Sequence, residues 1–177
     1  MPKKAEVRIS GLGGQGVVLA GQILGRAAVY DGKNAVQTQS YGAEARGSAA
    51  KSEVIISDDK IGFPAVRKCD ILIAMSQTAV DKHLKDLKKD GTLIVDSSNV
   101  KNIPEVKAGI YKVPATKTAE ATFGAKIYAN MIMLGALTKI TKIVSEKAFV
   151  KAIKDTVPAK TVKIDVRAYE KGLTLTA

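Results

Sequence analysis

The stretch Ile9-Ser10-Gly11-Leu12-Gly13-Gly14-Gln15-Gly16-Val17-Val18 decides the fold of this chain. Apolar residues alternate just before it, at Val7 and Ile9, as they do in a half-buried strand. Its glycines satisfy the pattern G-x-G-x-x-G. Beyond the last of them, apolar residues recur on one helical face at Val17, Ala20, Leu24, Ala27 and Ala28. The sequence therefore predicts a strand, a tight glycine-rich turn and a helix.

Such a turn has a specific physical use. Glycines permit a positive φ and allow a ligand to approach the backbone closely. The helix that follows presents unpaired N–H groups and the positive end of its dipole, which favour an anion. The pattern thus predicts an anion or nucleotide site at Gly11, Gly13, Gly14, Gln15 and Gly16. The alternative is a turn whose glycines serve packing alone.

One part of the dinucleotide-binding pattern is missing. A fold that binds NAD has an acidic residue about 20 residues after the glycines, at the end of the second strand. The second strand is expected at residues 35–38 and leads into Gln37-Thr38-Gln39-Ser40. Asp31 comes too early, in the turn after the helix. The sequence therefore disfavours a simple NAD-dependent dehydrogenase.

Length and composition indicate one domain spanning residues 1–177, with an aliphatic core because aromatic residues make up only 5%. The single cysteine, Cys69, excludes an internal disulfide. No apolar run reaches the ~20 residues that cross a bilayer, and no apolar signal region follows Met1-Pro2-Lys3-Lys4. We therefore expect a cytoplasmic protein that does not contact a membrane.

The formal net charge is +11, from lysines spread over the whole chain. No aromatic residues interleave with them as stacking platforms for bases would, so nucleic acid is not expected as a partner. A solvated basic surface is the simplest interpretation, and an acidic protein partner is the alternative.

Strand and helix patterns alternate along the rest of the chain. Strands are expected at 51–57, 69–75, 92–95 and 110–113, and helical segments at 118–122, 127–140, 146–156 and 162–171. A further amphipathic helix is marked by Val80, Leu84 and Leu87 and stopped by Asp90-Gly91. This alternation predicts a three-layer α/β/α sandwich with a mostly parallel, Rossmann-like sheet. Within it, Cys69 is expected in the core and His83 at the surface or an edge.

A second stretch, Ser40-Tyr41-Gly42-Ala43-Glu44-Ala45-Arg46-Gly47, fits neither strand nor helix periodicity well. Together with the glycine turn it resembles the gamma subunit of the 2-oxoacid:ferredoxin oxidoreductases, which include the pyruvate, 2-oxoglutarate and branched-chain 2-oxoacid enzymes. The resemblance covers almost the whole chain. Ser48 stands where members of the family often have a second glycine.

The resemblance implies one subunit of a complex that converts a 2-oxoacid, CoA and oxidised ferredoxin into acyl-CoA, carbon dioxide and reduced ferredoxin. No residue of this chain is expected to be catalytic, and the isolated chain is expected to be inactive because it lacks the cysteines for clusters and shows no obvious thiamine diphosphate signature. One cysteine and one histidine supply neither the ligands of an iron–sulfur cluster nor another metal site. Thiamine diphosphate and the 4Fe-4S clusters are therefore expected on partner subunits, with CoA a possible ligand of this chain.

The resemblance extends the candidate binding or subunit-interface site to Ser40, Tyr41, Gly42, Glu44, Arg46 and Gly47. If the first two strands are neighbours, this stretch and the glycine turn share one edge of the sheet. Two alternatives stay open: a free-standing nucleotide-binding oxidoreductase of Rossmann type, and an assembly subunit that binds no ligand.

Overall fold

The computed structural model describes residues 3–42 and 48–176 of the chain. Its strands form one six-stranded sheet in the order β2-β3-β1-β4-β5-β6. Their bounds are β1 Lys4–Leu12, β2 Asn34–Tyr41, β3 Ala49–Ser57, β4 Cys69–Ala74, β5 Leu87–Asp96 and β6 Gly109–Val113. Only β3 runs against the others, because it pairs antiparallel with both β1 and β2. The sheet is thus mostly parallel, as expected.

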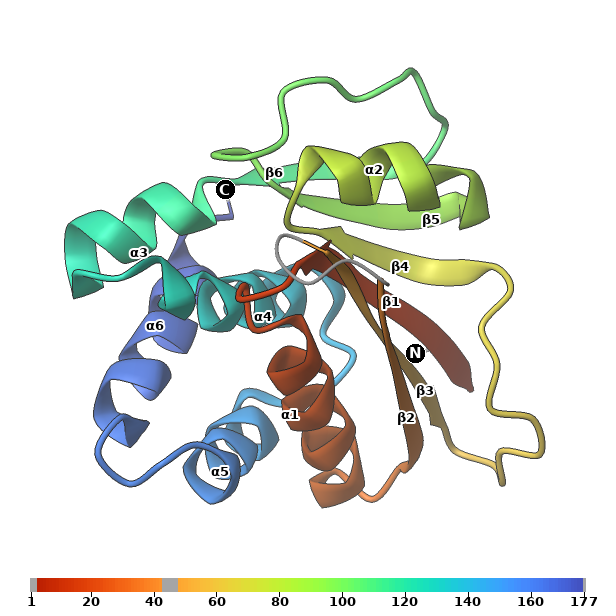
Figure 1. Cartoon of the computed structure of the whole chain (residues 1–177). Coiled ribbons are helices and arrows are strands. Elements are labelled where there is room, and N and C mark those ends of the chain that lie inside the picture. The colour runs from red at the N-terminus through yellow and green to blue at the C-terminus, as the bar shows by residue number, and fades with distance from the viewer. Residues whose placement is uncertain (1–2, 43–47, 177) are drawn as a thin grey trace.

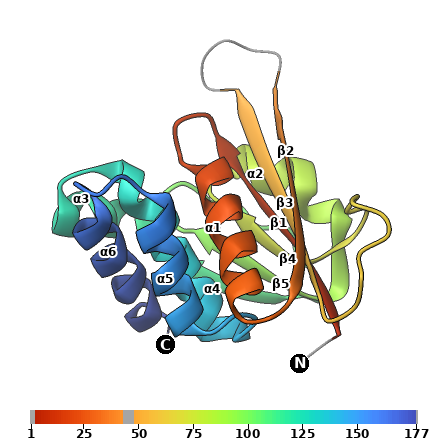
Figure 2. The same ribbon diagram turned by 90° about the horizontal axis from the view of Figure 1, so that it is seen from below.

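Helices cover both faces of the sheet unequally (Figures 1 and 2). One face carries α1 (Val17–Tyr30), α3 (Ala115–Phe123), α4 (Ala129–Thr141), α5 (Glu146–Thr156) and α6 (Val162–Thr174). A 3₁₀ turn, η2 (Lys126–Tyr128), leads into α4. The opposite face carries the short α2 (Gln77–His83) and its 3₁₀ extension η1 (Leu84–Asp86). The three-layer α/β/α arrangement is confirmed, with one thick and one thin outer layer.

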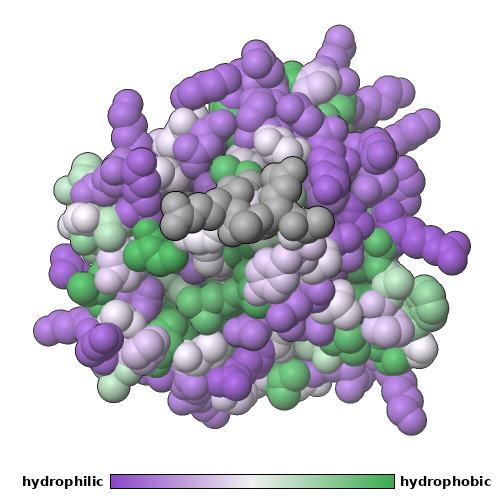
Figure 3. Space-filling model, viewed as in Figure 1, coloured by the Kyte–Doolittle hydropathy of each residue, from purple (hydrophilic) through white to green (hydrophobic). Residues whose placement is uncertain are grey.

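Each face of the sheet has its own, mainly aliphatic core, and the larger one also holds the stacked rings of Phe149 and Tyr169. The larger core packs strand residues such as Val7 and Ile9 against α1, α4, α5 and α6. The smaller core joins Leu72 and Leu93 to Val80 of α2. In the view of Figure 3, hydrophilic side chains project around most of the outline of the molecule. No helix within the described ranges is long and apolar enough to cross a membrane.

The region after β4 differs from the sequence-based expectation. The α-helix ends at His83, and Leu87 is the first residue of β5 rather than the end of a helix. Asp90-Gly91 lies inside β5, where the pairing with β4 shifts between Cys69 and Ile71. The prediction failed because Val80, Leu84 and Leu87 have helical spacing, although the last of them begins a buried strand.

The second strand also differs. It extends to Tyr41, well past the expected end at Thr38, because β2 and β3 form a long hairpin with pairs from Asn34–Ser57 to Tyr41–Ala50. Strand β3 therefore lies between β1 and β2, so the condition that the first two strands are neighbours is not met.

Candidate functional site

The glycine loop connects the end of β1 to the start of α1 and has the backbone that its sequence requires. Gly14 has φ 90° and Gly16 has φ 71°, in the left-handed region that favours glycine. Gly16 caps α1 without any side-chain hydrogen bond to the first turn. A Cβ built on the exposed Gly14 would meet no atom within 4 Å. Gly14 thus presents bare backbone to open space, whereas Gly16 lies against Asn130. No side chain caps the first turn of α1, and a helix N-terminus of this kind suits an anion.

Gln15 braces this loop from within. Its Oε1 accepts a 2.6 Å hydrogen bond from the backbone N–H of Leu12, and its Nε2 donates a 3.0 Å bond to the carbonyl oxygen of Met75, just after β4. Both ends of the amide are therefore engaged inside the protein. Among the glycine-loop residues predicted for the site, Gln15 shapes the loop, and Gly13 and Gly14 are the exposed ones.

The hairpin that carries the second predicted stretch contacts the glycine loop through Ser48, the residue that follows that stretch. The backbone N–H of Gly13 donates a 2.8 Å hydrogen bond to the carbonyl oxygen of Ser48, and that of Gly42 donates a 2.7 Å bond to Ala49. Both loops share one edge of the sheet although β1 and β2 are not neighbours. The reason is that both strands run antiparallel to β3 and so point the same way.

The structure places only part of this second stretch. Ser40 and Tyr41 end β2, and Gly42 follows them; all three are exposed, Tyr41 to 63%. The predicted site residues Glu44, Arg46 and Gly47 lie outside the described residues.

The loops occupy the position where open α/β sheets bind ligands. Helix α1 follows β1 on one face of the sheet, and α2 follows the adjacent β4 on the other face (Figure 1). The direction of winding therefore changes between β1 and β4. A crevice forms outside the carboxyl ends of strands at such a switch point. After β4, Ser76 Oγ accepts a hydrogen bond from the Ala79 N–H and caps α2.

A buried carboxylate at the end of β5, which sequence reasoning missed, extends the same edge. Asp96 is fully buried and accepts hydrogen bonds from Thr116 Oγ1 (2.5 Å), Thr116 N (3.1 Å), Ser98 N (3.1 Å) and Asn99 Nδ2 (3.3 Å). It thereby ties the loop after β5 to the start of α3. The polar run Asp96-Ser97-Ser98-Asn99 after an apolar strand was the available signal. A polar hollow of about 380 Å³ opens beside it, lined in part by Lys101, Lys117 and Lys126.

A second missed cluster lies on the α2 face. Arg8 is only 4% exposed and donates to Glu53 Oε2 (2.9 and 3.0 Å), Asp86 Oδ2 (2.8 Å) and the Val66 carbonyl (2.9 Å). His83 Nδ1 lies 3.5 Å from Arg8 Nη1. The expectation of a surface His83 is wrong, because α2 lays this residue over the Arg8 side of β1, where it is 7% exposed.

The chemistry of this cluster is structural. Burial, reinforced by the charge of Arg8, lowers the pKa of His83 to about 4, so the imidazole is neutral at physiological pH. Burial raises the pKa of Cys69 to about 11, so the thiol stays protonated in the core as expected. Within residues 3–42 and 48–176, no group of three or more His, Cys, Asp or Glu side chains is placed to hold a metal ion.

Comparison with known proteins agrees with this architecture. Residues 6–175 match the family described as pyruvate ferredoxin/flavodoxin oxidoreductase. The chain is 52% identical to 2-oxoglutarate synthase subunit KorC of Methanocaldococcus jannaschii over 172 residues, covering 96% of this chain and 92% of the relative.

Two solved structures extend the likeness. The keto/oxoacid ferredoxin oxidoreductase gamma subunit from Geobacter sulfurreducens superposes with a TM-score of 0.85 at 45% identity, covering 95% of each chain. The fold also recurs in 2-oxoglutarate:ferredoxin oxidoreductase from Magnetococcus marinus, solved with 2-oxoglutarate, coenzyme A and succinyl-CoA bound. There the TM-score is 0.88 at 22% identity, over 99% of this chain and 31% of the other. The chain therefore belongs to the pyruvate ferredoxin/flavodoxin oxidoreductase family, as a gamma subunit of a multi-subunit 2-oxoacid:ferredoxin oxidoreductase.

Proposed function

We propose that this gamma subunit serves a complex whose substrate is 2-oxoglutarate, and that its glycine loop contacts CoA. The substrate is supported by the 52% identity to KorC, a 2-oxoglutarate synthase subunit, over nearly the full length of both chains. In this reaction the 2-oxoacid loses carbon dioxide, its electrons pass to ferredoxin, and the acyl group forms a thioester with the CoA sulfur.

The contact with CoA rests on the geometry of the glycine loop. Gly14 faces open space with backbone only, and the uncapped N-terminus of α1 starts two residues later. CoA carries phosphate groups, which such an N-terminus favours through its N–H groups and its dipole. The bond between Gly13 and Ser48 brings the hairpin end to the same place. We propose that the site includes Gly11, Gly13, Gly14, Gln15, Gly16, Ser40, Tyr41, Gly42, Glu44, Arg46 and Gly47.

The redox cofactors belong on other subunits in this proposal. Cys69 is the only cysteine of the chain and lies buried in the core, so a cluster held by four thiolates has no ligand set here. This chain's residues hold and orient CoA, while the thiamine-binding and ferredoxin-like subunits perform the decarboxylation and the electron transfer. The isolated chain is accordingly expected to turn over no 2-oxoacid.

The glycine loop offers a matched pair of variants to test the contact with CoA. Gly14 (φ 90°) and Gly32 (φ 78°) both need a left-handed backbone, and a Cβ at either would meet nothing within 4 Å. Alanine therefore imposes similar backbone strain at both, on the order of 1–2 kcal/mol. Gly32 follows the far end of α1, away from the candidate site.

We expect Gly14→Ala to raise the KM for CoA of the purified complex by about tenfold, and Gly32→Ala to leave it unchanged. Equal KM values in both variants, with normal assembly, would favour the alternative of an assembly subunit whose loop binds no ligand. Comparing kcat/KM for 2-oxoglutarate and pyruvate in the wild-type complex tests the substrate, and a preference for pyruvate contradicts it.

A further inference from the structure

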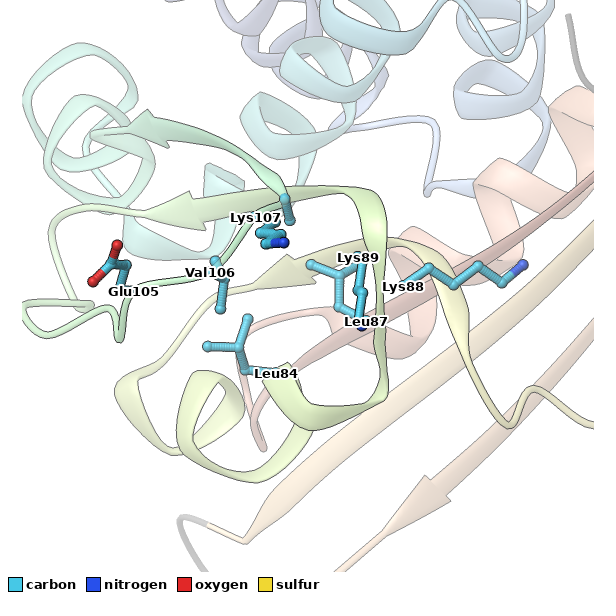
Figure 4. Close-up of a pocket in the computed structure, with 8 residues that line it drawn as sticks. Leu84, Leu87, Lys88, Lys89, Glu105, Val106 and Lys107 are labelled. Atoms are coloured by element: carbon cyan, nitrogen blue, oxygen red, sulfur yellow. The ribbon is translucent and has the colours of Figure 1, made fainter.

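An apolar groove opens at the edge of the sheet opposite the glycine loop. It lies where β5 and β6 begin, and its volume is about 430 Å³. The aliphatic side chains of Leu84, Leu87, Val106 and Ala108 line it. Figure 4 shows Leu84, Leu87 and Val106 gathered around the same hollow, although they come from η1, β5 and the loop before β6. Apolar surface in an open hollow is a favourable place for a side chain of another chain to be buried.

The rim of this groove is basic. Lys88 extends away from the hollow in Figure 4 and pairs with Asp70 Oδ1 at 2.7 Å and Glu6 Oε2 at 3.5 Å. Lys89 and Lys107 also line the groove, and neither forms a salt bridge within the part of the chain that the structure describes. Glu105 is the acidic residue of the lining. Two lysine charges are thus available to an incoming carboxylate.

The groove continues into an unpaired strand edge. Strand β6 is the last of the sheet and pairs with β5 alone. Ile110 and Tyr111, consecutive on this strand, are 39% and 40% exposed. Ile110 pairs in register with Leu93 of the α2-side core and so faces the same side of the sheet as the groove. An edge strand with exposed apolar side chains is a template for adding a strand from another chain.

We propose that the groove, its lysine rim and the β6 edge together form a docking surface for an extended acidic segment of another subunit of the complex. Backbone groups of the segment pair with β6, one of its apolar side chains enters the groove, and its carboxylates lie beside Lys89 and Lys107. A second copy of this chain is not the favoured occupant, because the lysines would repel a chain whose net charge is +11. The surface lies at the amino edge of the sheet, so the proposed CoA contact at the carboxyl edge stays uncovered.

Zero-length crosslinking of the purified complex tests this surface directly. A water-soluble carbodiimide joins a lysine amine to a carboxylate only where the two are in contact. We expect crosslinks from Lys89 or Lys107 to Asp or Glu residues of another subunit. Crosslinks from these lysines only to this chain, to a second copy of it, or to added ferredoxin would overturn the proposal, as would their absence while other lysines react.

A pair of charge-reversed complexes provides the second readout. The double variant Lys89→Glu with Lys107→Glu reverses the charge of the two rim lysines. The control, Lys147→Glu with Lys163→Glu, makes the same change in net charge at exposed positions of α5 and α6. We expect the rim variant to weaken association of this subunit about tenfold at low salt, and the control variant to assemble as the wild type does. Equal dissociation constants in the two complexes would contradict the proposal. The proposed CoA contact is tested separately, by the KM for CoA of the Gly14→Ala complex, so a failure of the docking surface would not bear on it.

Discussion

The side chains of Gln15 and Asn99 donate to one acceptor, the carbonyl oxygen of Met75, at 3.0 and 3.2 Å. Gln15 belongs to the loop after β1, Met75 follows β4, and Asn99 lies in the loop after β5. This shared acceptor joins the carboxyl ends of three adjacent strands, so the candidate site is a connected edge rather than a single turn. Asn99 also donates to Asp96, which carries the connection on to Thr116 of α3.

Gln15→Ala removes the side-chain amide that bonds to the backbone of Leu12 and Met75, and with it both of these hydrogen bonds. We expect the free energy of unfolding to fall by about 1–3 kcal/mol, because the Leu12 N–H loses its acceptor and the Met75 carbonyl loses one donor. Chemical denaturation of the purified chain measures this change. Gln22→Ala, on the exposed side of α1, is the matched control and should change stability little. Equal losses in the two variants would show that the brace contributes nothing.

His83 makes stability depend on pH. Its pKa is about 4 in the folded chain and near 6.5 when unfolded, so below pH 6.5 the unfolded chain takes up a proton that the folded chain does not. The free energy of unfolding is therefore highest above pH 6.5 and falls by about 1–3 kcal/mol as the pH decreases toward 4. Because His83 is the only histidine, denaturation curves of wild type and His83→Gln from pH 7 to pH 5 isolate its effect. The variant should have the flatter profile, and parallel profiles would contradict the assignment.

The sequence predicted the parts of the fold that depend on local periodicity. The alternation before Gly11 and the helical spacing after Gly16 identified β1, the turn and α1, which together hold the candidate site. The hairpin position was not predictable in the same way. Whether β2 pairs with β1 or with β3 depends on contacts between residues far apart in the chain, and the insertion of β3 leaves no local signal.

The buried polar clusters were missed for a related reason. Arg8 follows Val7 in β1 and so lies on the opposite face of the sheet, but nothing local shows that α2 covers that face and brings His83 within 3.5 Å. Likewise, Asp96 contacts Thr116 because β6 pairs with β5, which places the start of α3 next to the end of β5. Partners separated by 20 or 75 residues become visible only in the folded chain.

Arg46 remains a prediction from the sequence and the family resemblance. A guanidinium that contacts a phosphate or carboxylate contributes roughly 1.5–3 kcal/mol through charge-assisted hydrogen bonds. We expect Arg46→Ala to raise the KM for CoA or for the 2-oxoacid by at least about tenfold in the assembled complex, with assembly unchanged by size exclusion. Arg67→Ala, which removes an exposed guanidinium elsewhere, is the control. Wild-type constants in Arg46→Ala would show that this residue has no part in the site.

Asp96→Asn tests whether the carboxylate organises the carboxyl edge of β5 and β6. The carboxylate accepts from two backbone N–H groups and two side chains in a fully buried position. An amide offers one acceptor oxygen and turns an NH₂ toward donors, so at least one buried donor loses its partner. We expect unfolding free energy to fall by about 1–3 kcal/mol, measured by chemical denaturation. The same substitution at the exposed Asp90 should cost little.

The effect of Asp96→Asn should reach the candidate site. Because Asn99 links Asp96 to the Met75 carbonyl that also holds Gln15, loosening the β5 loop should loosen the glycine loop as well. Amide hydrogen exchange should therefore become faster at Leu12, whose N–H is held by Gln15, in Asp96→Asn but not in Asp90→Asn. Faster exchange confined to the β5 loop and α3 would show that the shared carbonyl does not couple the two loops.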